Sequence, residues 1–284
     1  MNRRITKFLI IANYSKKGAV EAANRVLEYI EDKGLEAKIS ISDEDIKDGL
    51  IREDLIKDAE CAIVLGGDGT LIRAVHTIRK HPIPMVGVNF GTIGFLTDVD
   101  IEDTQNMIDR LIEGDYETEE RMLLSGTVRG VMEERMIALN DIVVARSDAL
   151  RLIALRISLN GQFFDEYEAD GVIVSTPTGS TGYNLSAGGP VVNPKTSLLV
   201  ITPISPFAMA KKSIVFDADD KVEIELMEKR KDQDDGALVS FDGYENIQLQ
   251  VGDVVDIRRS KHTVTLLRFS DMNFYERLRS KIRN

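Results

Sequence analysis

Three glycines around one carboxylate form the part of the sequence best suited to chemistry. Five apolar residues, Cys61 to Leu65, run directly into Gly66-Gly67-Asp68-Gly69-Thr70, and apolar residues at helical spacing begin at Leu71. Glycine amides at such a strand–turn–helix junction can lie against phosphate oxygens, and the positive end of the helix favours the same ligand. The sequence therefore predicts phosphate binding at Gly66, Gly67, Gly69 and Thr70.

The acid at the tip of this turn, Asp68, needs its own explanation. A carboxylate beside phosphate is repelled unless it holds a metal ion or takes a proton from an attacking hydroxyl. The alternative is an Asp that caps the helix. The turn is neither a Walker loop, since no Lys-Ser or Lys-Thr follows at the required spacing, nor a G-x-G-x-x-G dinucleotide fingerprint.

A second concentration of polar groups lies in the C-terminal half. Asn140-Asp141 begins an apolar strand, and Asp170-Gly171 begins another that runs into the loop Ser175–Tyr183. This loop is dense in hydroxyls and small residues, so it can approach ribose or phosphate closely, and Tyr183 can stack on a base. A hydroxyl-rich surface turn is the alternative interpretation.

Composition limits the classes of partner. The 284 residues include 36 basic and 47 acidic side chains, a net charge of −11, which argues against nucleic acid and anionic membrane as partners. Cys61 is the only cysteine and lies in an apolar strand, so we expect a buried thiol and no internal disulfide. No apolar run approaches the ~20 residues of a membrane span, and we expect a cytoplasmic protein.

The elements that position these groups change in kind along the chain. Residues 1–116 alternate strands with helices, which predicts an α/β domain with a parallel sheet and ligands at the carboxyl ends of its strands. The expected strands are 8–12, 37–41, 61–65 and 85–89. Helices are expected over 20–30, ended by Gly34, over the acidic segment 42–60, from Leu71, and over 103–112, ended by Gly114.

Residues 117–284 show the period-two alternation of strands, which predicts a β-sandwich-like second domain. The expected strands include 125–129, 137–145, 151–159 and 221–227, with Asn160-Gly161 as a hairpin turn and 228–236 as a charged hairpin tip. The tail 275–283 reads as a short basic amphipathic helix that packs back on the first domain.

A second glycine turn, Asn89 to Phe95, is expected on the same sheet edge as the first. Its aromatic residues, Phe90 and Phe95, can form a wall for a base, and ordinary core packing is the alternative.

Taken together, these motifs resemble the NAD kinase family over a span from about residue 5 to the C-terminus. The motifs are Gly67-Asp68-Gly69-Thr70, Asn140-Asp141, Asp170-Gly171 and Thr176-Pro177-Thr178-Gly179-Ser180-Thr181-Gly182-Tyr183, in this order. Diacylglycerol kinases, sphingosine kinases and phosphofructokinases have similar glycine turns, whereas the hydroxyl loop is far more specific. The resemblance implies transfer of a terminal phosphoryl group to the adenosine ribose 2′-hydroxyl of NAD, which gives NADP.

The resemblance also implies residue roles. Asp68 takes the role of general base, Asn140 and Asp141 hold the NAD ribose, and Asp170 lies at the nicotinamide side. Residues from Thr181 to Ser186 line the adenine pocket, bordered by Phe95. The full set expected to bind NAD is Asp68, Gly69, Phe95, Asn140, Asp141, Arg151, Glu168, Asp170, Thr181, Gly182, Tyr183, Ser186 and Tyr244. Mg²⁺ is expected with ATP or polyphosphate as the donor, and the family commonly forms homodimers or homotetramers.

The sequence departs from the family at one position. Many bacterial relatives carry an Arg where this chain has Glu168, and a carboxylate cannot repeat an Arg contact to phosphate or ribose. Arg151 and Tyr244 align with positions that touch NAD in some relatives. Asp242-Gly243 lies nearby and is assigned no role.

Two other functions are considered. A lipid kinase of the same superfamily would need a membrane-facing apolar patch and leaves the Thr176–Tyr183 loop unexplained. A non-catalytic regulator that senses NADP would not need Asp68. The sequence leaves open whether ATP or polyphosphate is the donor, whether NADH is accepted, and whether NADP or NADPH inhibits.

Overall fold

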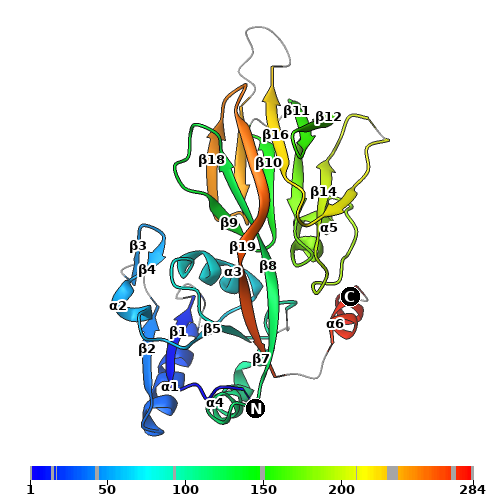
Figure 1. Cartoon of the computed structure of the whole chain (residues 1–284). Helices are drawn as coiled ribbons and strands as arrows, with labels where there is room; N and C mark the ends of the chain where they lie inside the picture. The colour runs from blue at the N-terminus through cyan, green and yellow to red at the C-terminus, as the bar shows by residue number, and fades with distance from the viewer. Residues whose placement is uncertain are drawn as a thin grey trace. The chain divides into compact units, whose positions relative to one another are not determined.

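The chain forms two compact units in a computed structural model. It describes residues 2–13, 16, 18–41, 45–91, 94–147, 151–208, 210–228, 236–269 and 273–282. Unit 1 comprises Met1–Glu120 with Val264–Asn284, and unit 2 comprises Arg121–Thr263 (Figure 1). The expected hairpin tip at 228–236 lies, except for its two end residues, outside the described residues, as do Thr92 and Ile93 of the second glycine turn.

Unit 1 contains the predicted parallel sheet. Its strands β1 (Lys7–Ala12), β2 (Glu36–Ser40), β5 (Cys61–Leu65) and β6 (Met85–Asn89) run in the order β2-β1-β5-β6, and all three pairings are parallel. The short β7 (Val99–Asp100) also pairs with β6 in parallel. Because β5 and β6 end together, the two glycine turns that follow them lie at one edge, as the sequence predicts.

Helices cover both faces of this sheet. Core residues of β1, β5 and β6 pack against α1 (Ala19–Asp32) and α4 (Thr104–Glu113). On the opposite face, a Cβ at Gly87 of β6 would lie 2.9 Å from Leu71 of α3 (Asp68–Thr77). The glycines that follow α1 and α4, Gly34 and Gly114, have φ of 72° and 75°, the left-handed conformation expected at helix ends.

The prediction of a helix over 42–60 is wrong. Residues 45–60 form a two-stranded hairpin, β3 (Ile46–Lys47) and β4 (Leu50–Ile51), followed by the one-turn helix α2 (Glu53–Ile56). Asp48 and Gly49 both have positive φ, 51° and 71°. An Asp-Gly pair in this conformation makes a tight hairpin turn, and that local preference overrides the helical spacing of the apolar residues.

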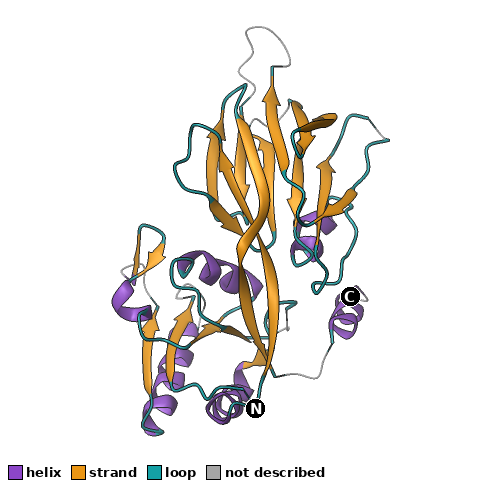
Figure 2. Cartoon of the chain, in the orientation of Figure 1, coloured by secondary structure: helices purple, strands orange, loops and turns teal. Residues whose placement is uncertain are grey.

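Unit 2 contains two facing antiparallel sheets, consistent with the predicted sandwich (Figure 2). One has the order β12-β11-β16-β19, and β8 pairs with β19 and with β9. The other has the order β15-β14-β13-β10-β17-β18. The first set of strands is β8 (Glu117–Val128), β9 (Met136–Ala138), β11 (Ile153–Leu159), β12 (Gln162–Ala169), β16 (Val222–Met227) and β19 (Val254–Arg268). The second is β10 (Asp141–Arg146), β13 (Gly171–Ser175), β14 (Leu198–Ile204), β15 (Ile214–Asp217), β17 (Ala237–Phe241) and β18 (Glu245–Leu249).

Side chains from both sheets form one core in unit 2. It includes Leu155 of β11 and Ile224 of β16 from one sheet, with Val174 of β13 from the other. Alternate residues of β11 are buried, which is the pattern that the sequence shows. Asn160 and Gly161 have φ of 53° and 79° and join β11 to β12, which confirms the predicted hairpin.

The C-terminal segment belongs to unit 1. The last part of β19 pairs Leu266 with Met85 of β6, and the helix α6 (Phe274–Ile282) places Arg277 against the loop that follows Gly94. The return of this helix to the first domain is confirmed. The division into units therefore differs from the expected boundary at 116/117, because the chain leaves unit 1 within β8 and comes back to it within β19.

Cys61 is fully buried in β5, and burial raises the pKa of its thiol far above the usual range. Among the described residues, no helix is long and apolar enough to cross a membrane.

Gly171 provides a test of packing in unit 2. Gly171 of β13 pairs with Ala145 of β10. A Cβ at Gly171 would lie 2.4 Å from the carbonyl oxygen of Val144, the residue before Ala145. Since that oxygen is backbone, Gly171→Ala is expected to lower the free energy of unfolding by about 1–3 kcal/mol in urea titrations. Gly69→Ala, where a Cβ meets nothing within 4 Å, is the control, and an equal loss in both variants would contradict this account.

Candidate functional site

The Asp68 carboxylate holds the loop that follows the second glycine turn. Its Oδ2 accepts the N–H of Phe95 at 2.8 Å, and its Oδ1 accepts those of Leu96 at 3.0 Å and Thr97 at 3.1 Å. The Thr97 hydroxyl donates to Oδ1 at 3.4 Å. Because α3 has no side-chain cap hydrogen bond, the helix-capping interpretation of Asp68 is wrong.

Gly94 is required by the close approach of this carboxylate. A Cβ at Gly94 would lie 1.9 Å from Asp68 Oδ1, and Gly94 N–H donates to Thr97 Oγ1 at 2.8 Å. Any larger residue at position 94 would displace Asp68. The structure thus brings Asp68 and Phe95 together through the Phe95 backbone. The Phe95 ring instead lies beside Phe274, with 6.2 Å between the two ring centroids.

The three glycines of the first turn differ in whether the surrounding structure leaves room for a side chain. A Cβ at Gly66 would lie 2.2 Å from Thr70 Oγ1, so Gly66 is required by the fold. Gly69 has nothing within 4 Å of such a Cβ, and Gly67 has only an ordinary contact at 3.6 Å. Neither has positive φ. The fold therefore leaves open space over Gly67 and Gly69, at the positive end of α3, where a phosphate would approach the backbone.

Two cations accompany this turn. Lys16, which was assigned no role from the sequence, has its Nζ 3.6 Å from the position of a Cβ at Gly67. Arg73, one turn along α3, lines a cavity of about 90 Å³ that adjoins Gly69 and Thr70. Basic groups here would offset the charge of a phosphate in a chain whose net charge is −11.

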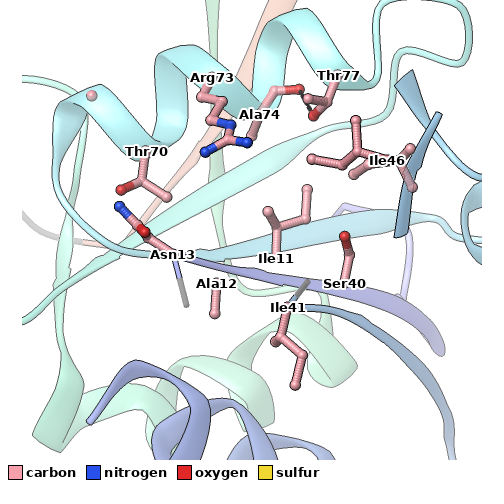
Figure 3. A pocket seen from close by; sticks show the side chains of 12 residues that line it. Ile11, Ala12, Asn13, Ser40, Ile41, Ile46, Thr70, Arg73, Ala74 and Thr77 are labelled. Carbon is pink, nitrogen blue, oxygen red and sulfur yellow. Dashed lines mark hydrogen bonds between the residues drawn. The ribbon is translucent and has the colours of Figure 1, made fainter. Parts of the chain in front are cut away.

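The cavity beside the turn combines apolar and polar walls. Thr70, Arg73 and Thr77 project from one face of α3 toward the ends of β1 and β2 (Figure 3). The lining residues are Ile11, Ala12, Asn13, Ser40, Ile41, Ile46, Ile51, Gly69, Thr70, Arg73, Ala74 and Thr77. A single water needs about 10–15 Å³, so the cavity has room for several waters or for a flat ring.

Asn140 and Asp141, in unit 2, are positioned by a second carboxylate. Asp242 accepts the N–H groups of three consecutive residues: Leu139 at 2.7 Å, Asn140 at 2.8 Å and Asp141 at 3.0 Å. The hairpin turn that carries Asp242 also carries Tyr244, which brings Tyr244 to the Asn140 turn. Sequence analysis missed the role of Asp242, although an Asp-Gly pair directly before Tyr244 was a visible signal.

The hydroxyl loop packs directly on Asn140. Thr176 N–H donates to the Asn140 carbonyl at 2.8 Å, and Thr176 Oγ1 donates to the Leu139 carbonyl at 2.6 Å. A Cβ at Gly179 would lie 2.1 Å from the Asn140 carbonyl oxygen, and one at Gly182 would lie 3.7 Å from Asn140 Nδ2. These contacts place the hydroxyl loop against the backbone of Leu139 and Asn140.

Several loop hydroxyls serve the fold. Thr176 and Ser180 are fully buried, and Ser180 Oγ donates to the Pro177 carbonyl at 2.6 Å. The interpretation of the loop as a simple surface turn is thus wrong. Thr181, in η3 (Gly179–Thr181), and Tyr183 and Ser186, in α5 (Tyr183–Ser186), retain exposure.

Asn184, within the same turn of helix, is fully buried. Its Nδ2 donates to the carbonyls of Ser180 and Pro190, and its Oδ1 accepts Thr202 Oγ1 at 2.6 Å. Asn184 is therefore a structural residue between the exposed Tyr183 and Ser186. Arg121 is another missed residue, buried and donating to Thr178 Oγ1 at 3.3 Å.

The electrostatics of Asp141 are unusual. Burial, and to a smaller extent the neighbouring Asp242 charge, raises the pKa of Asp141 to about 7. A group with this pKa changes charge near neutral pH, which is common at functional sites.

Asp170 has a basic partner from another strand. Arg146, at the end of β10, contacts Asp170 with Nε 2.7 Å from Oδ1. The positive charge near Asp170 thus comes from Arg146, while Glu168 is exposed on β12. Arg151 is also exposed and precedes β11, whose first residue, Ile153, pairs with Ala169.

The chemistry-bearing residues are thus divided between the two units. Unit 1 holds Gly66, Gly67, Asp68, Gly69, Thr70 and Phe95. Unit 2 holds Asn140, Asp141, Arg151, Glu168, Asp170, Thr181, Gly182, Tyr183, Ser186 and Tyr244. In the described part of the chain, no three His, Cys, Asp or Glu side chains are grouped to hold a metal ion.

Comparison with known protein families gives two matches. The ATP-NAD kinase N-terminal domain matches residues 40–116, and the ATP-NAD kinase C-terminal domain matches residues 139–269. The NAD kinase of Agathobacter rectalis is 42% identical over 279 residues, which is 98% of each chain. The NAD kinase of Lachnoclostridium phytofermentans is 40% identical over 281 residues, 97% of this chain and 98% of its own.

Solved structures agree with these matches. An NAD kinase from Archaeoglobus fulgidus in complex with ATP has a TM-score of 0.78 at 25% identity and covers 98% of both chains. Yeast NADH kinase complexed with NADH has a TM-score of 0.88 at 21% identity, covering 99% of this chain and 88% of its own, which shows the shared fold. These matches favour an NAD kinase over the lipid kinase and the non-catalytic regulator considered above. With both family domains matched and relatives at 40% identity or more over nearly the full length, the chain belongs to the NAD kinase family of enzymes.

Proposed function

We propose that this enzyme transfers the terminal phosphoryl group of ATP to the adenosine ribose 2′-hydroxyl of NAD, with Asp68 as general base. The observation that carries the proposal is the placement of Asp68, a carboxylate held by four hydrogen bonds beside glycine amides that the fold leaves open. A positioned carboxylate that takes the hydroxyl proton makes the ribose oxygen a competent nucleophile.

The hydrogen bonds of Asp68 suggest how the acceptor hydroxyl reaches it. A carboxylate has about four acceptor positions, two on each oxygen. Oδ1 accepts the amides of Leu96 and Thr97 and, at 3.4 Å, the Thr97 hydroxyl. Among the described residues, Oδ2 accepts only the Phe95 amide, at 2.8 Å. The second acceptor position of Oδ2 is therefore the one to which the substrate hydroxyl would donate its proton.

On the donor side, the open glycines favour phosphate and the cavity favours a nucleoside. Amides at Gly67 and Gly69, with Lys16 beside them, would bind the phosphates. The cavity lined by four isoleucines and Arg73 offers a surface for a base, which inorganic polyphosphate would not need. The ATP complex of the Archaeoglobus fulgidus relative supports ATP as the donor.

Mg²⁺ is expected to enter with the donor. Among the described residues, no three His, Cys, Asp or Glu side chains are grouped as metal ligands. Mg²⁺ commonly binds through substrate phosphates and keeps several waters, which fits this arrangement. When bound, it would offset phosphate charge, while the residues of this chain bind and orient the substrates.

On the acceptor side, the unit 2 residues would bind NAD. Asn140 and Asp141 are proposed for the ribose, Asp170 for the nicotinamide side, and the exposed Tyr183 for the adenine. The bound NADH of the yeast relative supports a dinucleotide ligand. The remaining residues proposed for NAD are Phe95, Arg151, Glu168, Thr181, Gly182, Ser186 and Tyr244. A cytoplasmic location and a homodimer or homotetramer stay predictions.

Asp68→Asn tests the base. We expect NADP formation from NAD, ATP and Mg²⁺ to fall by at least ~10²-fold, the usual scale for a missing general base, while the KM for NAD changes much less. Asp103→Asn, an exposed carboxylate at the start of α4, is the matched control and should keep wild-type turnover.

Gly94→Ala provides a second variant that leaves the carboxyl group chemically intact. Its Cβ would displace Asp68, so the same loss of turnover is expected. Wild-type turnover in both Asp68→Asn and Gly94→Ala would show that Asp68 is not the base.

Gly69→Ala separates ligand binding from folding. Alanine is favoured over glycine within a helix by up to about 1 kcal/mol, and Gly69 is the second residue of α3 with open space around it. We expect an unchanged or higher melting temperature together with at least a tenfold higher KM for ATP, since the methyl group would occupy the phosphate position. An unchanged KM for ATP would show that the donor phosphates do not bind at the Gly69 amide.

Asp141 predicts a pH dependence of NAD binding. A ribose hydroxyl donates more strongly to Asp141 when the carboxylate is ionised than when it is protonated, and the pKa of Asp141 is about 7. The Kd for NAD, measured by calorimetry, should therefore rise below pH 7 in the wild type, by up to about tenfold per pH unit, and should be flat in Asp141→Asn.

Stability gives an independent readout of the same titration. The raised pKa means that the native state binds a proton that the unfolded state has lost between about pH 4 and pH 7. The free energy of unfolding should thus fall as pH rises through this window, by up to ~1.4 kcal/mol per unit relative to Asp141→Asn. Parallel stability curves for the two proteins would mean that Asp141 is ionised throughout.

A further inference from the structure

Two arginines of the C-terminal segment hold the other side of the loop that Asp68 binds. Arg277 of α6 is 6% exposed, and its Nη1 donates to the carbonyls of Thr97 at 2.7 Å and Gly94 at 3.4 Å. Its Nη2 also pairs with the buried Asp98 carboxylate. These contacts fix α6 to both ends of the segment 94–98.

Arg268, at the end of β19, contacts the middle of the same segment. Its Nη1 donates to the Leu96 carbonyl at 2.8 Å, and its Nη2 to the Phe95 carbonyl at 3.4 Å. Its Nε is held by Glu119 at 2.7 Å, which keeps the guanidinium in place.

Three consecutive peptide groups therefore connect these arginines to Asp68. The peptide of Gly94 and Phe95 accepts from Arg277 through its carbonyl and donates to Asp68 through its N–H. The next two peptides, Phe95–Leu96 and Leu96–Thr97, accept from Arg268 and donate to Asp68. Hydrogen bonds in such a chain polarise and strengthen one another, most strongly where the groups are shielded from water.

The loop has no regular structure to hold it otherwise. Residues 94–98 belong to no helix or strand, so their amides face Asp68 only if other contacts orient the peptide planes. Besides the two arginines, Phe274 of α6 contacts the Phe95 ring, and Phe269 N–H donates to Asp98 at 2.6 Å. All of these additional contacts come from the C-terminal segment of unit 1.

We propose that Arg268 and Arg277 are positioning residues for Asp68, and that residues 264–269 and 273–282 of the C-terminal segment are part of the catalytic apparatus of unit 1. The inference rests on the proposed role of Asp68 as base. Neither arginine is argued to touch a substrate. They act by holding three peptide groups so that the carboxylate is fixed in one orientation.

The test compares Arg277 with Arg279, an exposed arginine of the same helix. For Arg277→Met we expect kcat to fall by about 10- to 100-fold, the range expected when a catalytic group is slightly misplaced, with the KM for NAD changed less than about threefold. Arg277→Lys keeps the charge but not the fork, so it should recover part of kcat, and it replaces Arg277→Met if that variant does not fold. Arg279→Met should match the wild type. Equal losses of kcat in Arg277→Met and Arg279→Met would show that both variants only destabilise the helix, and would overturn the proposal.

A double mutant tests whether Arg277 acts through Asp68. If it does, Arg277→Met should cost nothing further in kcat when added to Asp68→Asn. If the kcat losses of the two single variants multiply in the double mutant, the proposal is overturned.

Hydrogen exchange at the amides of residues 95–97 separates failure of this inference from failure of the proposed function. Faster exchange is expected in Arg277→Met and wild-type exchange in Arg279→Met. Unchanged protection in Arg277→Met would refute the positioning role whatever the activities are. Full activity of Asp68→Asn alone would instead refute Asp68 as base and leave only the structural contact.

Discussion

The hydrogen bonds between Asp68 and three consecutive backbone amides are the interaction on which the arrangement of the two glycine turns in unit 1 depends. They connect the first glycine turn to the second and fix an irregular loop against the start of α3. Backbone amides need acceptors when water is excluded, and an ionised acceptor gives the stronger bond. The same contacts that order the loop also orient the carboxylate.

Unit 2 uses the same device for another purpose. Asp242 accepts the amides of Leu139, Asn140 and Asp141, and the hydroxyl loop then packs on Asn140. In both units a carboxylate shapes a turn by accepting three consecutive backbone amides. In unit 2, burial raises the pKa of Asp141 and the Asp242 charge adds to this shift, so the residue that shapes the turn also affects the charge of Asp141.

The close approach of other groups to these turns restricts which residue types can occupy them. Gly94 and Gly179 are required because the Asp68 carboxylate and the Asn140 carbonyl lie where a Cβ would be. Gly67 and Gly69 are under no such constraint, so packing within the fold does not account for their lack of a side chain. Local cations, Lys16 beside the turn and Arg146 beside Asp170, provide positive charge in a chain that is acidic overall.

The sequence by itself determined the parallel sheet, the facing antiparallel sheets and the glycine turn, because these follow from apolar periodicity and from glycine's lack of a Cβ. It misplaced a helix at 42–60, where the turn preference of Asp48-Gly49 is stronger. Only the tertiary structure decided which groups Asp68, Asp242 and Arg277 bind. Arg277 and Gly94 are 183 residues apart, and Asp242 and Leu139 are 103 apart. No local pattern encodes such a pairing, since it depends on how the strands and the C-terminal helix pack.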